Sequence, residues 1–127
     1  MGHWLGGAVE MGQARGRQLG FPTANLQVEQ RFLQDLEQGV YAAWARWDQE
    51  GPKQALVNLG VRPTFGAGAL ALETHILDFS GDLYGKDLEI QLVERLRPER
   101  AFSGVEALRQ QIALDIKKTR AVLAGQR

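Results

Sequence analysis

The sequence has no cysteine among its 127 residues, which excludes disulfides and thiolate metal ligands and is compatible with a reducing compartment. It also lacks net charge, because Lys and Arg total 15 and Asp and Glu total 15. No overall field therefore favours nucleic acid or an anionic membrane, and any anion site must be local. No apolar run is long enough to cross a bilayer, and the N-terminus lacks a signal-peptide pattern. We expect a cytoplasmic protein that binds neither nucleic acid nor membrane.

Two familiar phosphate-binding motifs are missing as well. The chain contains neither GxxxxGK[ST] nor GxGxxG, so neither a P-loop nor a Rossmann turn is indicated. Internal repeats and low-complexity tracts are also absent, and turn signals are spread along the chain instead of forming one linker. This length can bury one core without metals or disulfides. We expect residues 1–127 to form a single domain.

The middle of the chain carries strand-like patterns. "GVYAAWARWD", from Gly39, is apolar on both faces and predicts a buried strand, and a turn with Gly51 and Pro52 leads into a second strand, "KQALVNLG". In "LALETHILDF" the alternation places Glu73 and His75 together, opposite a mainly apolar face. The clearest period of two lies in residues 87–92, in a strand that Pro98 should end.

Beyond Phe102 the period becomes helical. The apolar residues at this spacing are Val105, Leu108, Ile112, Ile116 and Leu123. Ser103 and Glu106 predict a capping box at the start of this helix. Short strands followed by one amphipathic helix predict a mainly β fold, a small β-barrel or strongly curved sheet with the helix packed outside.

The segment "GQARGRQLGFPTANL" combines features suited to phosphate. Gly12, Gly16 and Gly20 allow backbone N–H groups to turn toward an anion, while Arg15 and Arg17 offer planar forks for phosphate oxygens. A loop of this composition could lie over a polyphosphate. Glycine-rich turns with arginine are also common as solvated surface loops, and spacing alone leaves both interpretations open.

Thr23 and Asn25 follow in the same segment. Pro22 favours an extended chain there, so the two side chains should share one side, with their Cα atoms about 7 Å apart. A hydroxyl and an amide oxygen suit a Mg²⁺ ion that draws its anionic ligands from nucleotide phosphates. Ordinary cross-strand packing would explain Thr-x-Asn equally well.

At "RGRQLGFPTANL" the chain resembles the riboflavin kinase family, whose signature is a glycine and arginine loop leading into Pro-Thr-Ala-Asn. Further matches follow in the family's order: "GVYAAWA", "VNLGVRPTF", "LETHILDF", "DLYG" and "ERLRPERAFSGVEALRQQIALD". The resemblance covers residues 7–115 and implies a six-stranded antiparallel Greek-key β-barrel with a C-terminal amphipathic α-helix packed outside. It predicts a leader or linker remnant in residues 1–6, the barrel in residues 7–98 and the helix in residues 103–124.

The resemblance implies ATP-dependent phosphorylation of riboflavin at its 5′-hydroxyl, giving FMN and ADP. Thr23 and Asn25 match the family's Mg²⁺ and phosphate ligands, and Glu73 matches its catalytic base. Arg97 matches an arginine near the flavin. The family's flap over the ATP phosphates corresponds to residues 12–20, and the expected phosphate-binding residues are Gly12, Arg15, Gly16, Arg17, Gly20 and Thr23.

The match has one departure, because Met11-Gly12-Gln13 stands where many bacterial members have His-Gly-Asp. The leading "GHWL" resembles a segment that precedes the kinase domain in bifunctional bacterial proteins. We therefore expect an excised module, fused in the full-length protein to an N-terminal FMN adenylyltransferase domain, although a stand-alone kinase is an open alternative. Two rival classes are a non-catalytic flavin- or nucleotide-binding regulatory barrel and an oligonucleotide-binding barrel. Glu73 argues against the first. The second would require a basic, aromatic groove, and the zero net charge argues against it.

Overall fold

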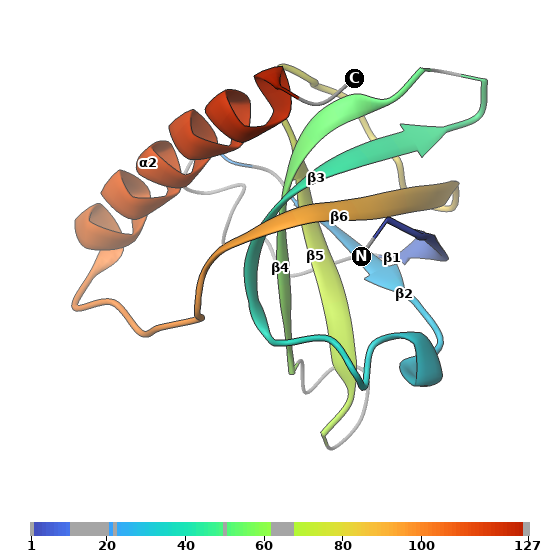
Figure 1. Cartoon of the computed structure of the whole chain (residues 1–127), viewed down its shortest axis with the longest axis horizontal. Helices are drawn as coiled ribbons and strands as arrows, with labels where there is room; N and C mark the ends of the chain where they lie inside the picture. The colour runs from blue at the N-terminus through green and yellow to red at the C-terminus, as the bar shows by residue number, and fades with distance from the viewer. Residues whose placement is uncertain (1, 11–20, 22, 50, 62–67, 126–127) are drawn as a thin grey trace.

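The computed structural model describes residues 2–10, 21, 23–49, 51–61 and 68–125. Within these residues the chain forms a closed antiparallel barrel of six strands with one α-helix on its outside (Figure 1). The strand order around the barrel is β1-β2-β5-β4-β3-β6, so β2 pairs with β5 and β1 with β6 across long stretches of sequence. The elements are β1 Trp4–Glu10, β2 Ala24–Gln27, a 3-10 turn Gln30–Phe32, β3 Gly39–Trp47, β4 Lys53–Val61, β5 Leu70–Ile76, β6 Asp87–Arg97 and α2 Val105–Ala124. The prediction of a mainly β barrel with a C-terminal helix is confirmed.

The barrel interior follows from the period of two in the strands. In β6, Leu88, Ile90 and Leu92 are 1%, 0% and 2% exposed, while Asp87 is exposed and Glu89 and Gln91 are half-buried. The same alternation in β5 buries Leu72 and Ile76 and leaves Glu73 and His75 only half-buried. Because successive strand residues point to opposite faces, Glu73 and His75 lie on the outer face of the barrel. This agrees with the prediction that they share the face opposite the apolar residues.

A second apolar layer lies outside the barrel, beneath α2. Val40, Leu56 and Leu77 form a small buried cluster, and Leu96, Ile112 and Ile116 pack against it. This layer explains why β3 has almost no polar face: one side fills the barrel and the other supports the helix. The expected buried strand and outer helix are both confirmed. None of the helices in the described residues is long and apolar enough to cross a membrane.

The barrel begins earlier than expected, which corrects the assignment of residues 1–6 to a leader. Trp4, Leu5 and Gly6 belong to β1 and pair with Gln91, Ile90 and Glu89 of β6. The guanidinium of Arg46 also lies 3.7 Å from the centre of the Trp4 ring, a cation–π contact. The pairing of β1 with β6 closes the barrel, and both contacts join residues far apart in sequence, so local composition could not reveal them.

The start of α2 also differs from the prediction. The capping box required Ser103 at the N-cap and Glu106 three residues later, but the N-cap is Gly104 and no side chain caps it. The shift of one residue removes the required spacing. Val105, expected in the apolar stripe, is 57% exposed. The fully buried residues of the helix include Asp115 and Thr119 as well as Leu123.

Candidate functional site

Three polar side chains lie side by side on the outer face of the barrel. In the sheet register Glu73 of β5 is directly opposite Asn25 of β2 on one side and Asn58 of β4 on the other. Directly opposite residues of antiparallel strands point to the same face, with Cβ atoms about 4.5–5.5 Å apart. We call Asn25, Glu73 and Asn58 the amide–carboxylate row. Barrel pairing thus joins three segments that are remote in sequence.

The row contains buried oxygens without hydrogen-bond partners. Among the described residues, the buried side-chain oxygens in this state are Asn25 Oδ1, Asn58 Oδ1 and Thr74 Oγ1, and Asn25 is only 5% exposed. Native structures rarely leave such atoms unpaired, because each costs about 1–3 kcal/mol. A bound cation or a hydroxyl donor would offset that cost. Two of the three oxygens flank Glu73, so the row has the character of a ligand site.

Thr23 lies directly before β2 and is half-buried. Alternation along the extended chain places it on the same side as Asn25. The aromatic ring of Phe21 meets the ring of His75 edge-on, with centroids 5.8 Å apart, which ties the segment before β2 to β5. The described structure therefore brings Thr23, Asn25 and Glu73 to one area of the outer face. Of the expected phosphate-binding residues, only Thr23 is among the described residues; the others lie outside them, and all of these roles stay predictions: Gly12, Arg15, Gly16, Arg17 and Gly20.

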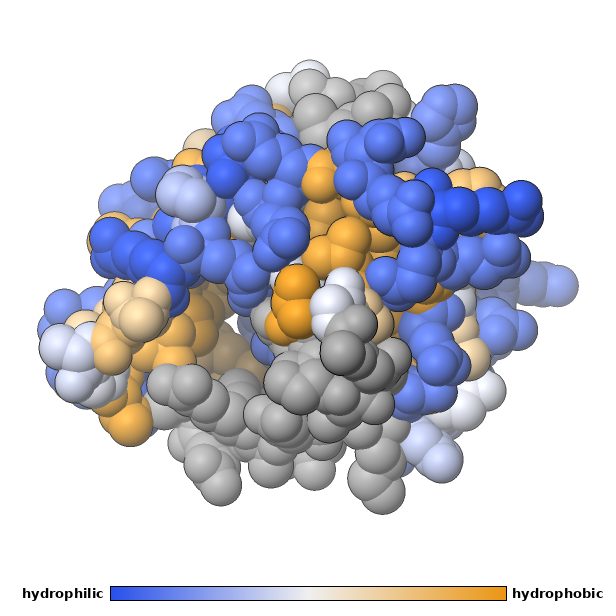
Figure 2. Space-filling model, turned by 90° about the horizontal axis from the view of Figure 1, so that it is seen from below, coloured by the Kyte–Doolittle hydropathy of each residue, from blue (hydrophilic) through white to orange (hydrophobic). Residues whose placement is uncertain are grey.

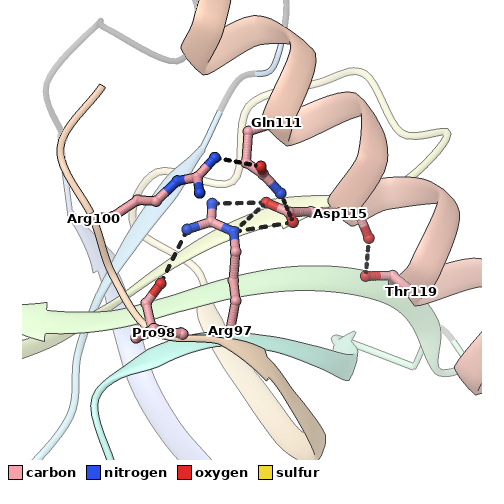
Figure 3. Close-up of polar contacts among 6 residues, drawn as sticks. All are labelled: Arg97, Pro98, Arg100, Gln111, Asp115 and Thr119. Carbon is pink, nitrogen blue, oxygen red and sulfur yellow. Dashed lines mark hydrogen bonds and ion pairs between the residues drawn. The ribbon is translucent and has the colours of Figure 1, made fainter. Parts of the chain in front are cut away.

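Arg97, the expected flavin-binding residue, is held in a buried ion pair. Its Nε donates to both carboxylate oxygens of Asp115 at 3.1 Å, its Nη2 donates to Oδ2 at 2.8 Å, and its Nη1 donates to the Pro98 carbonyl at 3.1 Å (Figure 3). The side chains of Arg97 and Asp115 are 15% and 1% exposed. This bidentate ion pair, which suits the planar guanidinium, joins the end of β6 to α2.

Other polar groups complete this anchor. Gln111 Nε2 donates to Asp115 Oδ1 at 2.9 Å, and Arg100 Nη2 donates to Gln111 Oε1 at 2.7 Å. Thr119 Oγ1 donates to the Asp115 carbonyl one turn back, at 2.8 Å. All of these groups are visible together on the inner side of α2 (Figure 3). We call Arg97, Gln111 and Asp115 the helix anchor.

The amide–carboxylate row and the helix anchor lie along one line of cross-strand neighbours on the outer face of the barrel. Val40 of β3 is opposite Asn58 of β4 and also opposite Arg97 of β6. At the adjacent position Gly39 has φ +153°, and a Cβ there would lie 2.6 Å from the Arg97 carbonyl oxygen, so only glycine permits this approach of β3 to β6. The line therefore changes from polar, at β2, β5 and β4, to apolar beneath α2.

A hollow is visible from below between α2 and the barrel, and its visible wall on the α2 side is apolar (Figure 2).

A second ion pair joins α2 to the chain after β5: Arg120 Nη1 and Nη2 donate to Asp78 Oδ2 and Oδ1 at 2.8 and 2.9 Å. This hydrogen bonding lowers the pKa of Asp78 and raises the pKa of Arg120. Both side chains are well exposed, unlike the buried Arg97 and Asp115.

Reasoning from the sequence missed two residues of this face. Asn58 stands in the "VNLG" segment, where an amide within an otherwise apolar strand was a readable signal. Asp115 stands next to Ile116 and three residues after Ile112, so a carboxylate interrupts the apolar stripe of the helix. Buried charges are almost always paired, and a charge in that stripe therefore indicated a partner on the barrel.

The side chains of Thr23 and of Asn25 in the row restrict the kind of metal ion that this area could hold. The described residues contain no group of three or more His, Cys, Asp or Glu that could hold a metal ion. Thr23 and Asn25 offer neutral oxygens, and Asn25 Oδ1 is buried without a partner. Such a pair fits a hard cation whose remaining ligands are waters and phosphate oxygens.

Comparison with known proteins gives a consistent result. The family model described as "Flavokinase: Riboflavin kinase" matches residues 2–123. A curated protein of Pseudomonas fluorescens, named bifunctional riboflavin kinase/FMN adenylyltransferase, is 42% identical over 122 residues, which are 94% of this chain and 38% of that protein. The chain thus spans well under half the length of that relative.

Solved structures share the fold. A crystal structure described as a macrolide-efflux protein from Streptococcus pneumoniae has a TM-score of 0.79 and 31% identity, over 92% of this chain and 38% of that one. Riboflavin kinase from Trypanosoma brucei has a TM-score of 0.75 and 26% identity, over 97% of this chain and 78% of that one. With the family model matching nearly the whole length and the row placing Asn25 beside Glu73, the chain belongs to the riboflavin kinase family.

Proposed function

We propose that this chain transfers the terminal phosphoryl group of ATP to the 5′-hydroxyl of riboflavin, giving FMN and ADP. The observation that carries the proposal is the amide–carboxylate row, in which Glu73 stands between two buried amide oxygens that have no protein partner. A carboxylate beside unsatisfied oxygens is suited to an alcohol and a cation arriving together. Membership of the riboflavin kinase family supports the choice of substrate.

Glu73 acts at the alcohol in this proposal. Its carboxylate orients the 5′-hydroxyl and accepts the hydroxyl proton as the oxygen bonds to the γ-phosphorus. The bond between that phosphorus and the bridging oxygen breaks, and ADP leaves with the bonding electrons. Phosphoryl transfer asks a protein mainly for alignment and charge neutralisation, so one correctly placed carboxylate is sufficient as a base.

Thr23 and Asn25 are the residues that would hold Mg²⁺. When bound, this ion neutralises charge on the ATP phosphates. The buried Asn25 Oδ1, which lacks a partner, is the observation that fits such a role. We further propose that the phosphate-binding contacts come from Gly12, Arg15, Gly16, Arg17 and Gly20, as the family resemblance implies.

The flavin ring is assigned to the apolar end of the line, beneath α2. A hollow lies between α2 and the barrel, and its visible wall on the α2 side is apolar, as a planar ring system requires (Figure 2). Arg97 points from the same side, and the helix anchor fixes its guanidinium. Its Nη1 and Nη2 each carry a second N–H, and these would contact the flavin.

The full-length protein is also part of the proposal. The Pseudomonas fluorescens relative is named as bifunctional, and this chain matches only 38% of it. We propose that this chain acts as the riboflavin kinase module of a longer protein that also carries an FMN adenylyltransferase domain. The kinase reaction itself is assigned to the residues of the row.

A direct assay tests the proposed function. The purified chain is incubated with riboflavin, ATP and Mg²⁺, and FMN is measured by chromatography, with parallel reactions lacking ATP or containing excess chelator. FMN formation that requires both ATP and the metal supports the proposal. Riboflavin binding without FMN formation would instead show a flavin-binding module without kinase activity.

A further inference from the structure

We infer that Asn58 orients the substrate: its Oδ1 accepts a hydrogen bond from a secondary hydroxyl of the ribityl chain, beside the 5′-hydroxyl held by Glu73. This inference rests on the proposed function and adds a residue that selects for a polyhydroxylated chain. Asn58 is assigned here as a residue that touches substrate without taking part in proton transfer.

The first support is the position of Asn58. It is directly opposite Glu73 in the pairing of β4 with β5, so the two side chains project side by side from the outer face. Asn58 is half-buried, while its Oδ1 is buried and has no hydrogen-bond partner. The residue is thus placed to touch whatever binds to Glu73, and it has an acceptor to satisfy.

The second support is the spacing across the row, which separates Asn58 from the proposed metal. Asn25 and Asn58 are two strand spacings apart, about 9–10 Å, with Glu73 between them. Ligands of one Mg²⁺ ion lie about 2.1 Å from it and therefore about 4 Å or less from each other. With Glu73 between them at that spacing, we assign the oxygen of Asn58 a partner other than the ion proposed at Asn25.

The third support is the change of polarity along the line. The order is Asn25, Glu73, Asn58 and then Val40, where the buried apolar layer beneath α2 begins. Riboflavin has the same order from its reactive end: a terminal hydroxyl, a chain of secondary hydroxyls and then an apolar ring. With the terminal hydroxyl at Glu73, a secondary hydroxyl is the donor that reaches Asn58.

The test compares two substrates on two proteins. One substrate is riboflavin, and the other is an isoalloxazine whose N10 chain is 5-hydroxypentyl, which keeps the reacting alcohol and lacks the secondary hydroxyls. For riboflavin, we expect Asn58→Leu to lower kcat/KM about tenfold, the upper range for a hydrogen bond between neutral groups. For the hydroxypentyl analogue, we expect kcat/KM of Asn58→Leu to be within about twofold of wild type, because the lost contact is absent from that substrate.

Gln54→Leu is the matched control, because Gln54 lies on the same face of the same strand, outside the row. We expect it to behave as wild type on both substrates. A loss in Asn58→Leu of equal size on both substrates would show a merely structural role and would overturn the inference. Unchanged activity on riboflavin would also overturn it.

Failure of the kinase assignment can be distinguished from failure of this inference. Flavin fluorescence measures binding without catalysis, and the same two flavins and two proteins are compared by Kd. If the wild type binds riboflavin and forms no FMN, the kinase proposal fails, while an analogue-dependent loss of binding in Asn58→Leu still supports the contact. If Asn58→Leu binds both flavins as wild type does, the contact is refuted. If the wild type binds neither flavin, both ideas fail.

Discussion

The amide–carboxylate row and the helix anchor are two polar clusters on the same outer face of one barrel, and their hydrogen bonding differs. In the anchor, the buried Asp115 carboxylate accepts hydrogen bonds from both Arg97 and Gln111. In the row, Asn25 Oδ1 and Asn58 Oδ1 are buried without partners. Polar groups that satisfy one another hold elements together, whereas polar groups left unsatisfied require a ligand. The difference indicates that the row is the cluster that requires a ligand, while the anchor holds α2 against the barrel and fixes the guanidinium of Arg97.

The largest effect is expected from breaking the helix anchor. Asp115→Ala leaves the buried guanidinium of Arg97 without its carboxylate. Removing one partner of a buried ion pair costs about 3–5 kcal/mol, so we expect the free energy of unfolding to fall by that amount. Urea denaturation followed by circular dichroism measures the change.

The double variant Arg97→Met with Asp115→Leu is the control for that experiment. It removes both charges and replaces them with apolar groups, which is often neutral or stabilising. We expect it to be clearly more stable than Asp115→Ala alone. Equal loss in both variants would mean that packing, and not the unpaired charge, explains the effect.

The next effect concerns catalysis at the row. Glu73→Gln keeps the shape of the side chain and removes the base, so we expect kcat to fall about a hundredfold or more, with little change in riboflavin binding. The matched control is Glu89→Gln, which alters a half-exposed carboxylate on the outer face of β6, paired with Arg46. Chromatographic measurement of FMN compares the three proteins. Wild-type turnover in Glu73→Gln would remove Glu73 from the mechanism.

A smaller effect is expected at Asn25, where the substitution should raise the free energy of unfolding, whereas Asp115→Ala lowers it. Replacing Asn25 with Leu removes a buried oxygen that has no partner, and the ligand-free protein should gain about 1 kcal/mol in free energy of unfolding. FMN formation should fall sharply, because a proposed metal ligand is lost. Thermal unfolding and the FMN assay are run on the same preparation. A variant that loses stability as well as activity would show that Asn25 supports the fold and not the ligand.

The sequence allowed much of the fold to be predicted, for physical reasons. The period of two in residues 87–92 separated Leu88, which lies inside the barrel, from its polar neighbours, and the alternation around Glu73 and His75 predicted that these two share one face. These predictions depend only on neighbours along one strand. The resemblance to a family supplied the barrel and assigned Thr23, Asn25 and Glu73 to a single site.

Other features depend on contacts between distant residues and could not be predicted from local patterns. The pairing of Asn58 with Glu73 is set by the register of β4 against β5. The pairing of Trp4 with Gln91 is set by barrel closure. The role of Asp115 appears only once α2 lies against β6, since its partner is Arg97. A local pattern shows which way a side chain points, and the register determines what it meets.

The smallest effect is expected at the exposed counterpart of the anchor, Asp78 with Arg120. Asp78→Asn keeps the side-chain shape and suits the positive φ of 58° at this position. Because hydrogen bonding to Arg120 lowers the pKa of Asp78 in the folded protein, its contribution to stability is present above the ordinary value of 3.8 and is lost as the pH falls through the lowered pKa. We therefore expect Asp78→Asn to melt slightly below wild type at neutral pH, with the gap closing in acid and in high salt. Thermal melts at several pH values measure this gap, and a gap that widened in acid would contradict the assigned direction of the pKa shift.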